Sequence, residues 1–158
     1  KEQLELAMET IGATGIRVSE LTYITVEAAQ GGRATVCLKG KVRVILIPDR
    51  LCLKLLEYAK GQGIESGEIF VTRSGKGLSR RQIWREMKAI GEQAGVESSK
   101  VFPHNLRHMF ATVFYKMCRD IVKLADELGH SSIETTRIYL VTTGEEHSWQ
   151  MNRLELIL

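Results

Sequence analysis

β-branched and apolar residues are concentrated in one short part of the chain, and this feature most narrows the folds that the chain can adopt. They form three runs, at Ile24–Val26, Ala34–Leu38 and Val42–Ile47. Two glycine-containing pairs, Gly31-Gly32 and Lys39-Gly40, separate the runs, and such pairs are typical of tight turns. The pattern predicts a small antiparallel sheet of three strands.

Helical patterns cover most of the remaining sequence. Ser79 and Gln82 resemble a capping box, Pro103 suits a first helical turn, and Gly129 can end a helix. The predicted helices are one ending near Gly12, a short one at Arg17–Leu21 capped by Thr14, Leu51–Tyr58, Ser79 to about Ala94, Pro103 to about Met117, Ile121–Leu128, a short one from Ser131 towards Tyr139, and Glu145–Leu158, with a short strand at Ile69–Val71. We therefore predict an α+β fold, mostly helical, with the sheet on one side.

The bulk properties are those of one ordinary globular domain over residues 1–158. A formal net charge of +3 permits a nucleic-acid partner without arguing strongly for one. Three scattered cysteines with no CxxC pair suggest neither a zinc site nor a disulfide framework. No apolar run approaches the roughly 20 residues of a membrane span. We expect no cofactor, no metal, no membrane, and a cytoplasmic location. Because the chain opens on Lys1 inside a helical pattern, we also expect an excised fragment.

Two arginines are candidates for holding a phosphodiester. Arg17 and Arg107 lie 90 residues apart, so only the fold can bring them together. Guanidinium groups are always charged and donate two parallel hydrogen bonds, which suits the charge that gathers on phosphate oxygens in a transition state. Either arginine alone is more often a surface residue, but the neighbouring motifs favour the functional interpretation.

Histidines accompany the second arginine. His104 precedes Arg107 by three residues, so both project from one helix face, and His104 could donate to a phosphate oxygen or accept the proton of a nucleophile. His130 follows Leu-Gly just before a predicted helix, where it could donate to the same phosphate. His104 and His108 have zinc-like spacing, but the glutamate of H-E-x-x-H and a third ligand are missing, so packing is the better interpretation of His108.

Tyr139 is the candidate nucleophile, nine residues after His130. A phenol with a pKa near 10 attacks weakly at neutral pH, but nearby arginines and histidines favour its phenolate. The product would be a phosphotyrosine ester to the 3′ end with a free 5′-hydroxyl, and rejoining would need no ATP. A tyrosine standing alone would be a half-buried aromatic, as we expect for Tyr23, Tyr58 and Tyr115.

These motifs resemble those of the tyrosine recombinases, the phage integrase family, over nearly the whole chain. The local text that carries the resemblance is Thr14-Gly-Ile-Arg17-Val-Ser-Glu20-Leu, Pro103-His-Asn-Leu-Arg107-His, and Leu128-Gly-His-Ser-Ser-Ile-Glu-Thr-Thr-Arg-Ile-Tyr139. The resemblance implies a catalytic domain that cuts and rejoins DNA. By this resemblance Arg17 and Arg107 clamp the phosphate, His104 and His130 assist, and Tyr139 attacks.

The resemblance also implies a hairpin lysine as general acid for the leaving 5′-oxygen. The family usually shows Gly-Lys-Gly followed by polar residues and an arginine, whereas Leu38 replaces the first glycine here. Aligning Arg43 with the family arginine favours Lys39, with Lys41 second. Glu20, one turn after Arg17, is expected to orient that arginine, unless the two form a plain surface pair.

Family properties further imply double-stranded DNA as partner and a homo-oligomer, with a tetramer on DNA. An N-terminal core-binding domain, which normally closes a clamp round the duplex, is expected to be missing from this fragment. Glu145–Leu158 is expected either to exchange between neighbouring copies or to pack on its own copy. The protein would accompany the nucleoid of a bacterial or phage-encoded system.

Three alternatives remain open at this point. A type IB topoisomerase-like enzyme would share the chemistry without partner exchange, and supercoil relaxation would separate it from a recombinase. A non-catalytic DNA-binding regulator would bind without a covalent adduct. A metal-dependent nuclease would lose cleavage in chelator.

Overall fold

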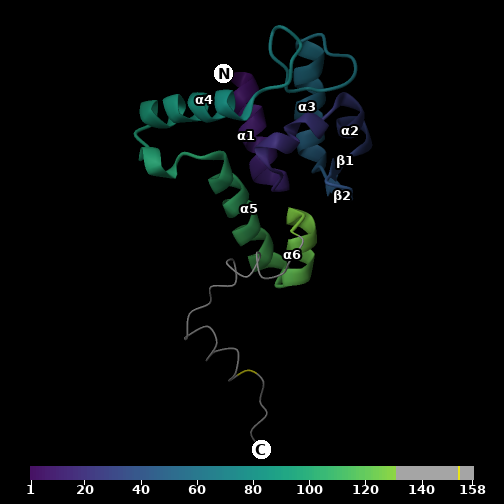
Figure 1. Ribbon diagram of the computed structural model, residues 1–158, viewed down its shortest axis with the longest axis vertical. Helices are drawn as coiled ribbons and strands as arrows, with labels where there is room; N and C mark the ends of the chain where they lie inside the picture. The colour runs from purple at the N-terminus through teal and green to yellow at the C-terminus, as the bar shows by residue number, and fades with distance from the viewer. Residues whose placement is uncertain (131–152, 154–158) are drawn as a thin grey trace, which may run out of the picture.

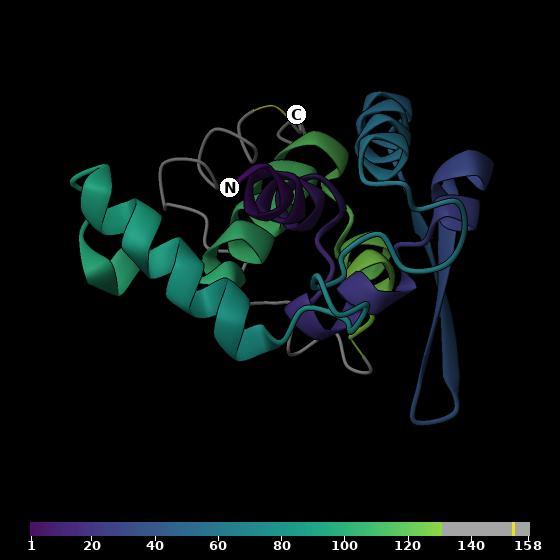
Figure 2. The ribbon, with the colours of Figure 1, turned by 90° about the horizontal axis from the view of Figure 1, so that it is seen from above.

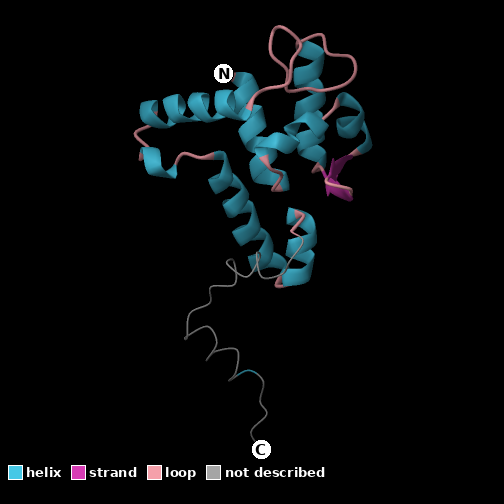
Figure 3. Cartoon of the chain, viewed as in Figure 1, coloured by secondary structure: helices cyan, strands magenta, loops and turns pink. Residues whose placement is uncertain are grey.

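The computed structural model describes residues 1–130 and residue 153 of the chain, and within them helices dominate (Figure 1, Figure 3). The elements in chain order are α1 (Glu2–Thr14), the 3₁₀ helix η1 (Val18–Tyr23), α2 (Val26–Gly31), β1 (Arg33–Leu38), β2 (Lys41–Leu46), α3 (Asp49–Gly61), α4 (Arg80–Gln93), the short 3₁₀ helix η2 (Ser98–Lys100), α5 (Pro103–Cys118) and α6 (Ile121–Leu128). The mostly helical α+β fold is confirmed, with one small antiparallel sheet.

The sheet has two strands within the described residues, not the predicted three. β1 and β2 pair antiparallel from Arg33↔Leu46 to Leu38↔Lys41. Their turn residues Lys39 and Gly40 both have positive φ, 49° and 75°, as a tight two-residue hairpin turn requires. Figure 2 shows this hairpin reaching away from the helices.

The predicted first strand, Ile24–Val26, is wrong. Thr25 accepts a hydrogen bond on its side chain from the backbone N–H of Ala28, at 3.0 Å, and so caps α2, which starts at Val26. An isolated bridge between Thr25 and Glu68 is the strand-like pairing in this segment. The cap, followed by good helix formers, outweighs the β propensity of three residues.

Two smaller predictions are also corrected. Thr14 does not cap the next helix: it ends α1, and its hydroxyl donates to the Thr10 carbonyl at 2.6 Å, while Arg17 is the N-cap of η1. Ile69–Val71 forms no strand, because Val71 makes a single isolated bridge to Gly77. The helices predicted to start near Ser131 and at Glu145 lie outside the described residues.

The helix ends that frame the site were predicted correctly. The Ser79 side chain accepts from the Gln82 N–H at 3.1 Å at the start of α4, and Pro103 begins α5. Gly129 ends α6 in the left-handed conformation. The main core joins α1, α2, α3, α4 and the inward face of the sheet, and a second small cluster of Ala111, Leu124 and Leu128 joins α5 to α6.

A close approach at Gly15 positions α5 against the end of α1. Gly15 has φ 68°, and a Cβ there would lie 2.3 Å from the Phe110 ring. Only glycine fits this contact without strain. As a result, Arg107, about one turn before Phe110, faces the end of α1.

Candidate active site

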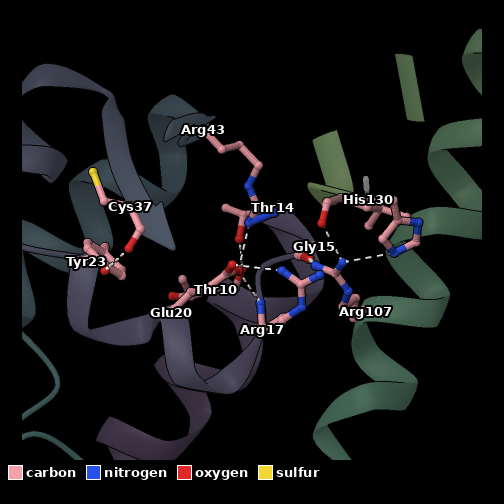
Figure 4. A network of polar contacts seen from close by, with 11 residues as sticks. Thr10, Thr14, Gly15, Arg17, Glu20, Tyr23, Cys37, Arg43, Arg107 and His130 are labelled. Carbon is pink, nitrogen blue, oxygen red and sulfur yellow. Dashed lines mark hydrogen bonds and ion pairs between the residues drawn. The ribbon is translucent and has the colours of Figure 1, made fainter. Parts of the chain in front are cut away.

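Arg107 is buried, with 4% of its surface exposed, and joins two helix ends. Its Nη1 donates to the carbonyl of Gly15, the C-cap of α1, and its Nη2 donates to the carbonyl of Leu128, the last residue of α6, at 2.6 Å. Carbonyls at helix C-termini lack partners within their helix and carry partial negative charge, so a guanidinium suits them. These contacts fix the orientation of the arginine before any ligand binds (Figure 4).

Arg17 is held by a carboxylate that belongs to its own turn. Glu20 Oε2 accepts from the Arg17 backbone N–H at 2.7 Å, and Glu20 Oε1 accepts from Arg17 Nη1 at 3.1 Å. Glu20 is 1% exposed, so the pair is not a plain surface pair. The Arg17 side chain remains 41% exposed and lines a cavity. The orienting role expected for Glu20 is consistent with this geometry.

Arg43 completes the network from the sheet. It lies on β2, opposite Val36, and its Nη2 donates to Glu20 Oε2 at 2.7 Å. Its side chain is 13% exposed, and this burial lowers the pKa of the guanidinium, partly offset by Glu20. Two arginines from different elements thus share one buried carboxylate (Figure 4).

Both candidate histidines favour their neutral forms. Burial, followed by the charges of Arg107, Arg17 and Arg43, lowers the pKa of His130 to about 4. His130 Nε2 lies 3.3 Å from Arg107 Nη2. Burial also lowers the pKa of His104, with contributions from His108 and Arg107. A neutral imidazole offers one donor and one acceptor, which suits contact with a phosphate or a phenol.

A metal interpretation of the histidine pair gains no support from the geometry. The rings of His104 and His108 lie 5.2 Å apart between centroids, tilted by 39°. Among the described residues, no group of three metal-binding side chains could hold an ion.

Four of the six predicted site residues line one cavity of about 800 Å³: Arg17, His104, Arg107 and His130. Lys39 lines an adjoining cavity of about 840 Å³, which shares Arg17 and His130 with the first and also contains Lys41. Tyr139 lies outside the described residues. The fold therefore brings together residues from the start of η1, from α5 and from the end of α6, while the hairpin borders the same site.

Some residues of the site were missed by sequence reasoning. Arg80, Arg81 and Trp84, on α4, line the first cavity together with Phe102. The pair Arg80-Arg81 after the Ser79 cap was a usable signal, because basic residues at a helix start are unfavourable for the helix dipole and so suggest another purpose. No local pattern indicated the contact between Arg43 and Glu20.

None of the described helices is long and apolar enough to cross a membrane.

The family model for the phage integrase family matches residues 1–146. The chain is 34% identical over 151 residues to the tyrosine recombinase XerA of Pyrococcus furiosus, covering 91% of this chain and 52% of that protein. It is 36% identical over 143 residues to XerC of Roseiflexus castenholzii, covering 84% and 45%. The chain thus spans about half the length of these curated relatives.

Solved structures show the same fold. The XerH site-specific recombinase bound to its difH substrate, in a pre-cleavage complex, superposes with a TM-score of 0.75 at 26% identity, over 93% of this chain and 45% of that one. The crystal structure of XerA recombinase matches with a TM-score of 0.74 at 24% identity, over 99% and 61%, and so supports the fold alone. By fold and by the match over most of its length, the chain belongs to the phage integrase family.

Proposed function

We propose that this chain is the catalytic domain of a site-specific tyrosine recombinase, which cuts and rejoins DNA through a 3′-phosphotyrosine intermediate. One observation carries the proposal: Arg17, His104, Arg107 and His130, from separate parts of the chain, line a single cavity. Two guanidiniums and two neutral imidazoles offer a phosphodiester both charge and hydrogen bonds. Membership of the family supports the same reaction.

In this reaction the arginines stabilise the charge that develops on the non-bridging oxygens. Arg107 is fixed by two helix-end carbonyls, and Arg17 by Glu20, so neither must reorganise when the phosphate arrives. Fixed donors aimed at developing charge usually supply the largest catalytic term, with about 3–4 kcal/mol from a single donor.

The bond changes balance without ATP. Tyr139 Oη forms a bond to phosphorus as the bond from phosphorus to the 5′-oxygen breaks, and the 5′-oxygen leaves as a hydroxyl. His104 or His130 accepts the phenolic proton: each is neutral at pH 7 in the free protein, and the bound phosphate offsets the neighbouring arginine charges that lower the pKa of each imidazole, which makes it a stronger base. Lys39 donates the proton to the leaving oxygen, with Lys41 as the second choice. Reversal of these steps rejoins a strand.

The proposed partner is double-stranded DNA. Relatives of known structure include XerH bound to difH substrate and the Tn1549 transposon integrase in complex with transposon right end DNA. We further propose that residues 1–158 act as one catalytic domain and assemble as a homo-oligomer on DNA, a tetramer, with Glu145–Leu158 contacting either its own or a neighbouring copy. This substrate would place the protein with the nucleoid in the cytoplasm.

A nicked DNA suicide substrate tests the proposal, because loss of the short fragment that carries the free 5′-hydroxyl traps the covalent adduct. We expect a protease-sensitive adduct on a denaturing gel with the wild-type protein and none with Tyr139→Phe. Tyr58→Phe, on α3, is the matched control and should behave as wild type. The adduct should form equally in EDTA. An adduct that survives Tyr139→Phe, or binding without an adduct across a pool of junction sequences, would contradict the proposal.

A further inference from the structure

Arg43 contacts the neighbours of two proposed phosphate-binding residues, Arg17 and His130, and it does so from a third element of the fold. It belongs to β2, whereas Arg17 precedes η1 and His130 follows α6. On one side its Nη2 donates to Glu20. On the other it packs against Gly129, where a Cβ would lie 2.2 Å from Arg43 Nη1 and 2.9 Å from Cζ.

The contact with Glu20 determines where that carboxylate points. Glu20 Oε2 receives two donors, the Arg17 backbone N–H and Arg43 Nη2, both at 2.7 Å. With Oε2 fixed, the plane of the carboxylate aims Oε1 at the Arg17 guanidinium, 3.1 Å away. Removing Arg43 would leave a carboxylate that is 1% exposed with one cationic partner and one fewer constraint on its plane.

The contact with Gly129 limits where His130 can lie. Gly129 has φ 67°, and the Arg43 side chain occupies the space beside it that any other residue would fill. His130 follows directly, and its backbone N–H donates to the Ala125 carbonyl at 2.9 Å. The guanidinium therefore forms one wall of the turn that presents the imidazole.

We propose that Arg43 is a positioning residue, which orients Arg17 through Glu20 and His130 through Gly129, so that the middle of the hairpin fixes the phosphate-binding side of the site. This rests on the proposed function, because the positioned groups are those assigned to the phosphate. Arg43 itself touches no reacting atom in this scheme.

Single-turnover cleavage of two nicked substrates tests the proposal, one with the ordinary 5′-oxygen and one with a bridging 5′-sulfur, which leaves as a thiolate and needs no proton. We expect Arg43→Gln to slow cleavage of both substrates by about 30-fold, since small misplacements of catalytic groups cost up to about a hundredfold. Lys39→Ala should be slow with oxygen and restored with sulfur. Arg43→Lys, which keeps the cation, should recover several-fold over Arg43→Gln.

Tyr23→Phe is the matched control. The Tyr23 hydroxyl donates to the Cys37 carbonyl at 2.8 Å and so also ties the hairpin to η1, but through a hydrogen bond to β1 that involves neither Glu20 nor Gly129. Its cleavage rate should stay near wild type. Wild-type rates in Arg43→Gln, or rescue of Arg43→Gln by sulfur as for Lys39→Ala, would overturn the proposal. If Arg43→Gln does not fold, Arg43→Lys carries the same comparison.

A second readout keeps this proposal separate from the proposed function. Histidine NMR titration follows His130 without any DNA. Because the charge of Arg43 contributes to the lowered pKa of His130, that pKa should rise in Arg43→Gln and stay unchanged in Tyr23→Phe. An unchanged pKa of His130 in Arg43→Gln would refute the link between Arg43 and His130, even if the wild-type protein forms the adduct. A raised pKa of His130 in Arg43→Gln, with no adduct from the wild-type protein, would support the link between Arg43 and His130 and reject the proposed reaction.

Discussion

The arginine at the centre of the site and the lysine at the hairpin tip are held in opposite ways. Arg107 is 4% exposed and bonded to carbonyls from two helices. Lys39 is exposed, in a two-residue turn with φ 49°, on a hairpin that reaches away from the helices (Figure 2). A permanent charge works best when fixed in advance, whereas a proton donor must reach a leaving group that changes during the reaction.

The largest effect is expected from a substitution of Arg107, the arginine that is held in place by two carbonyls. Arg107→Ala should lower adduct formation by about a thousandfold, because a preorganised donor is lost. It should also lower the free energy of unfolding by about 2–4 kcal/mol, because the carbonyls of Gly15 and Leu128 lose their donors. Suicide-substrate cleavage and urea denaturation measure the two effects. Arg107→Lys, with charge but a single ammonium, should restore only part of each.

Substitution of the proposed acid in the hairpin should lower the cleavage rate without lowering the stability. Lys39→Ala should slow cleavage by about a hundredfold, as expected when a general acid is removed. Its melting temperature should match wild type, since Lys39 is exposed. Lys41→Ala, two residues away, should stay within about twofold of wild type, as most surface substitutions do. A larger loss of cleavage rate in Lys41→Ala than in Lys39→Ala would instead assign the role of general acid to Lys41.

Two glycines with similar backbone angles allow the packed helices and the exposed hairpin to be compared through their stability. Gly15→Ala should lower the free energy of unfolding by about 2–3 kcal/mol, because its Cβ would enter the Phe110 ring and φ is 68°. Gly40→Ala, with φ 75° and nothing within 4 Å of its Cβ, should cost about 1–2 kcal/mol from backbone strain alone. Urea denaturation of both variants measures the difference. Equal losses would mean that the Gly15 contact with α5 is loose.

Local patterns predicted the helices and the hairpin but not the contacts between them. Ser79, Pro103 and Gly129 act within a few residues of their own positions, so their effects could be predicted from the sequence. Ile24–Val26 has the composition of a strand, yet the Thr25 cap decides for helix. In this segment one capping hydrogen bond decides between strand and helix, and the composition of the segment does not reveal that bond.

The site followed the same rule. Arg17, His104, Arg107 and His130 were predicted from motifs, and the fold brings them to one cavity. The burial of Arg107 on Gly15, across 92 residues of chain, has no sequence signal. The same is true of Arg43, whose partner Glu20 lies 23 residues away on another element. Contacts of this kind arise only when separate helices pack.

The smallest expected effect is a pH dependence of stability from His130. Its pKa is about 4 in the folded chain and about 6.5 in an unfolded one. Because the folded value is lowered, the unfolded state binds the proton more readily, so stability is fully present above pH 6.5 and is lost as the pH falls towards 4. The slope from one such group cannot exceed about 1.4 kcal/mol per pH unit, and partial exposure of the ring reduces it.

The comparison of wild type with His130→Gln isolates this contribution, because the lowered pKa of His104 acts in the same direction in both proteins. Urea denaturation between pH 4 and pH 7.5 should show the two stability curves diverging as the pH rises from 4 to 6.5 and running parallel above it. A bound phosphate would offset the charges of Arg107, Arg17 and Arg43 and raise the pKa of His130 again. Burial and the fixed arginines together therefore keep the imidazole neutral until the phosphate arrives, and parallel curves throughout would show that they do not.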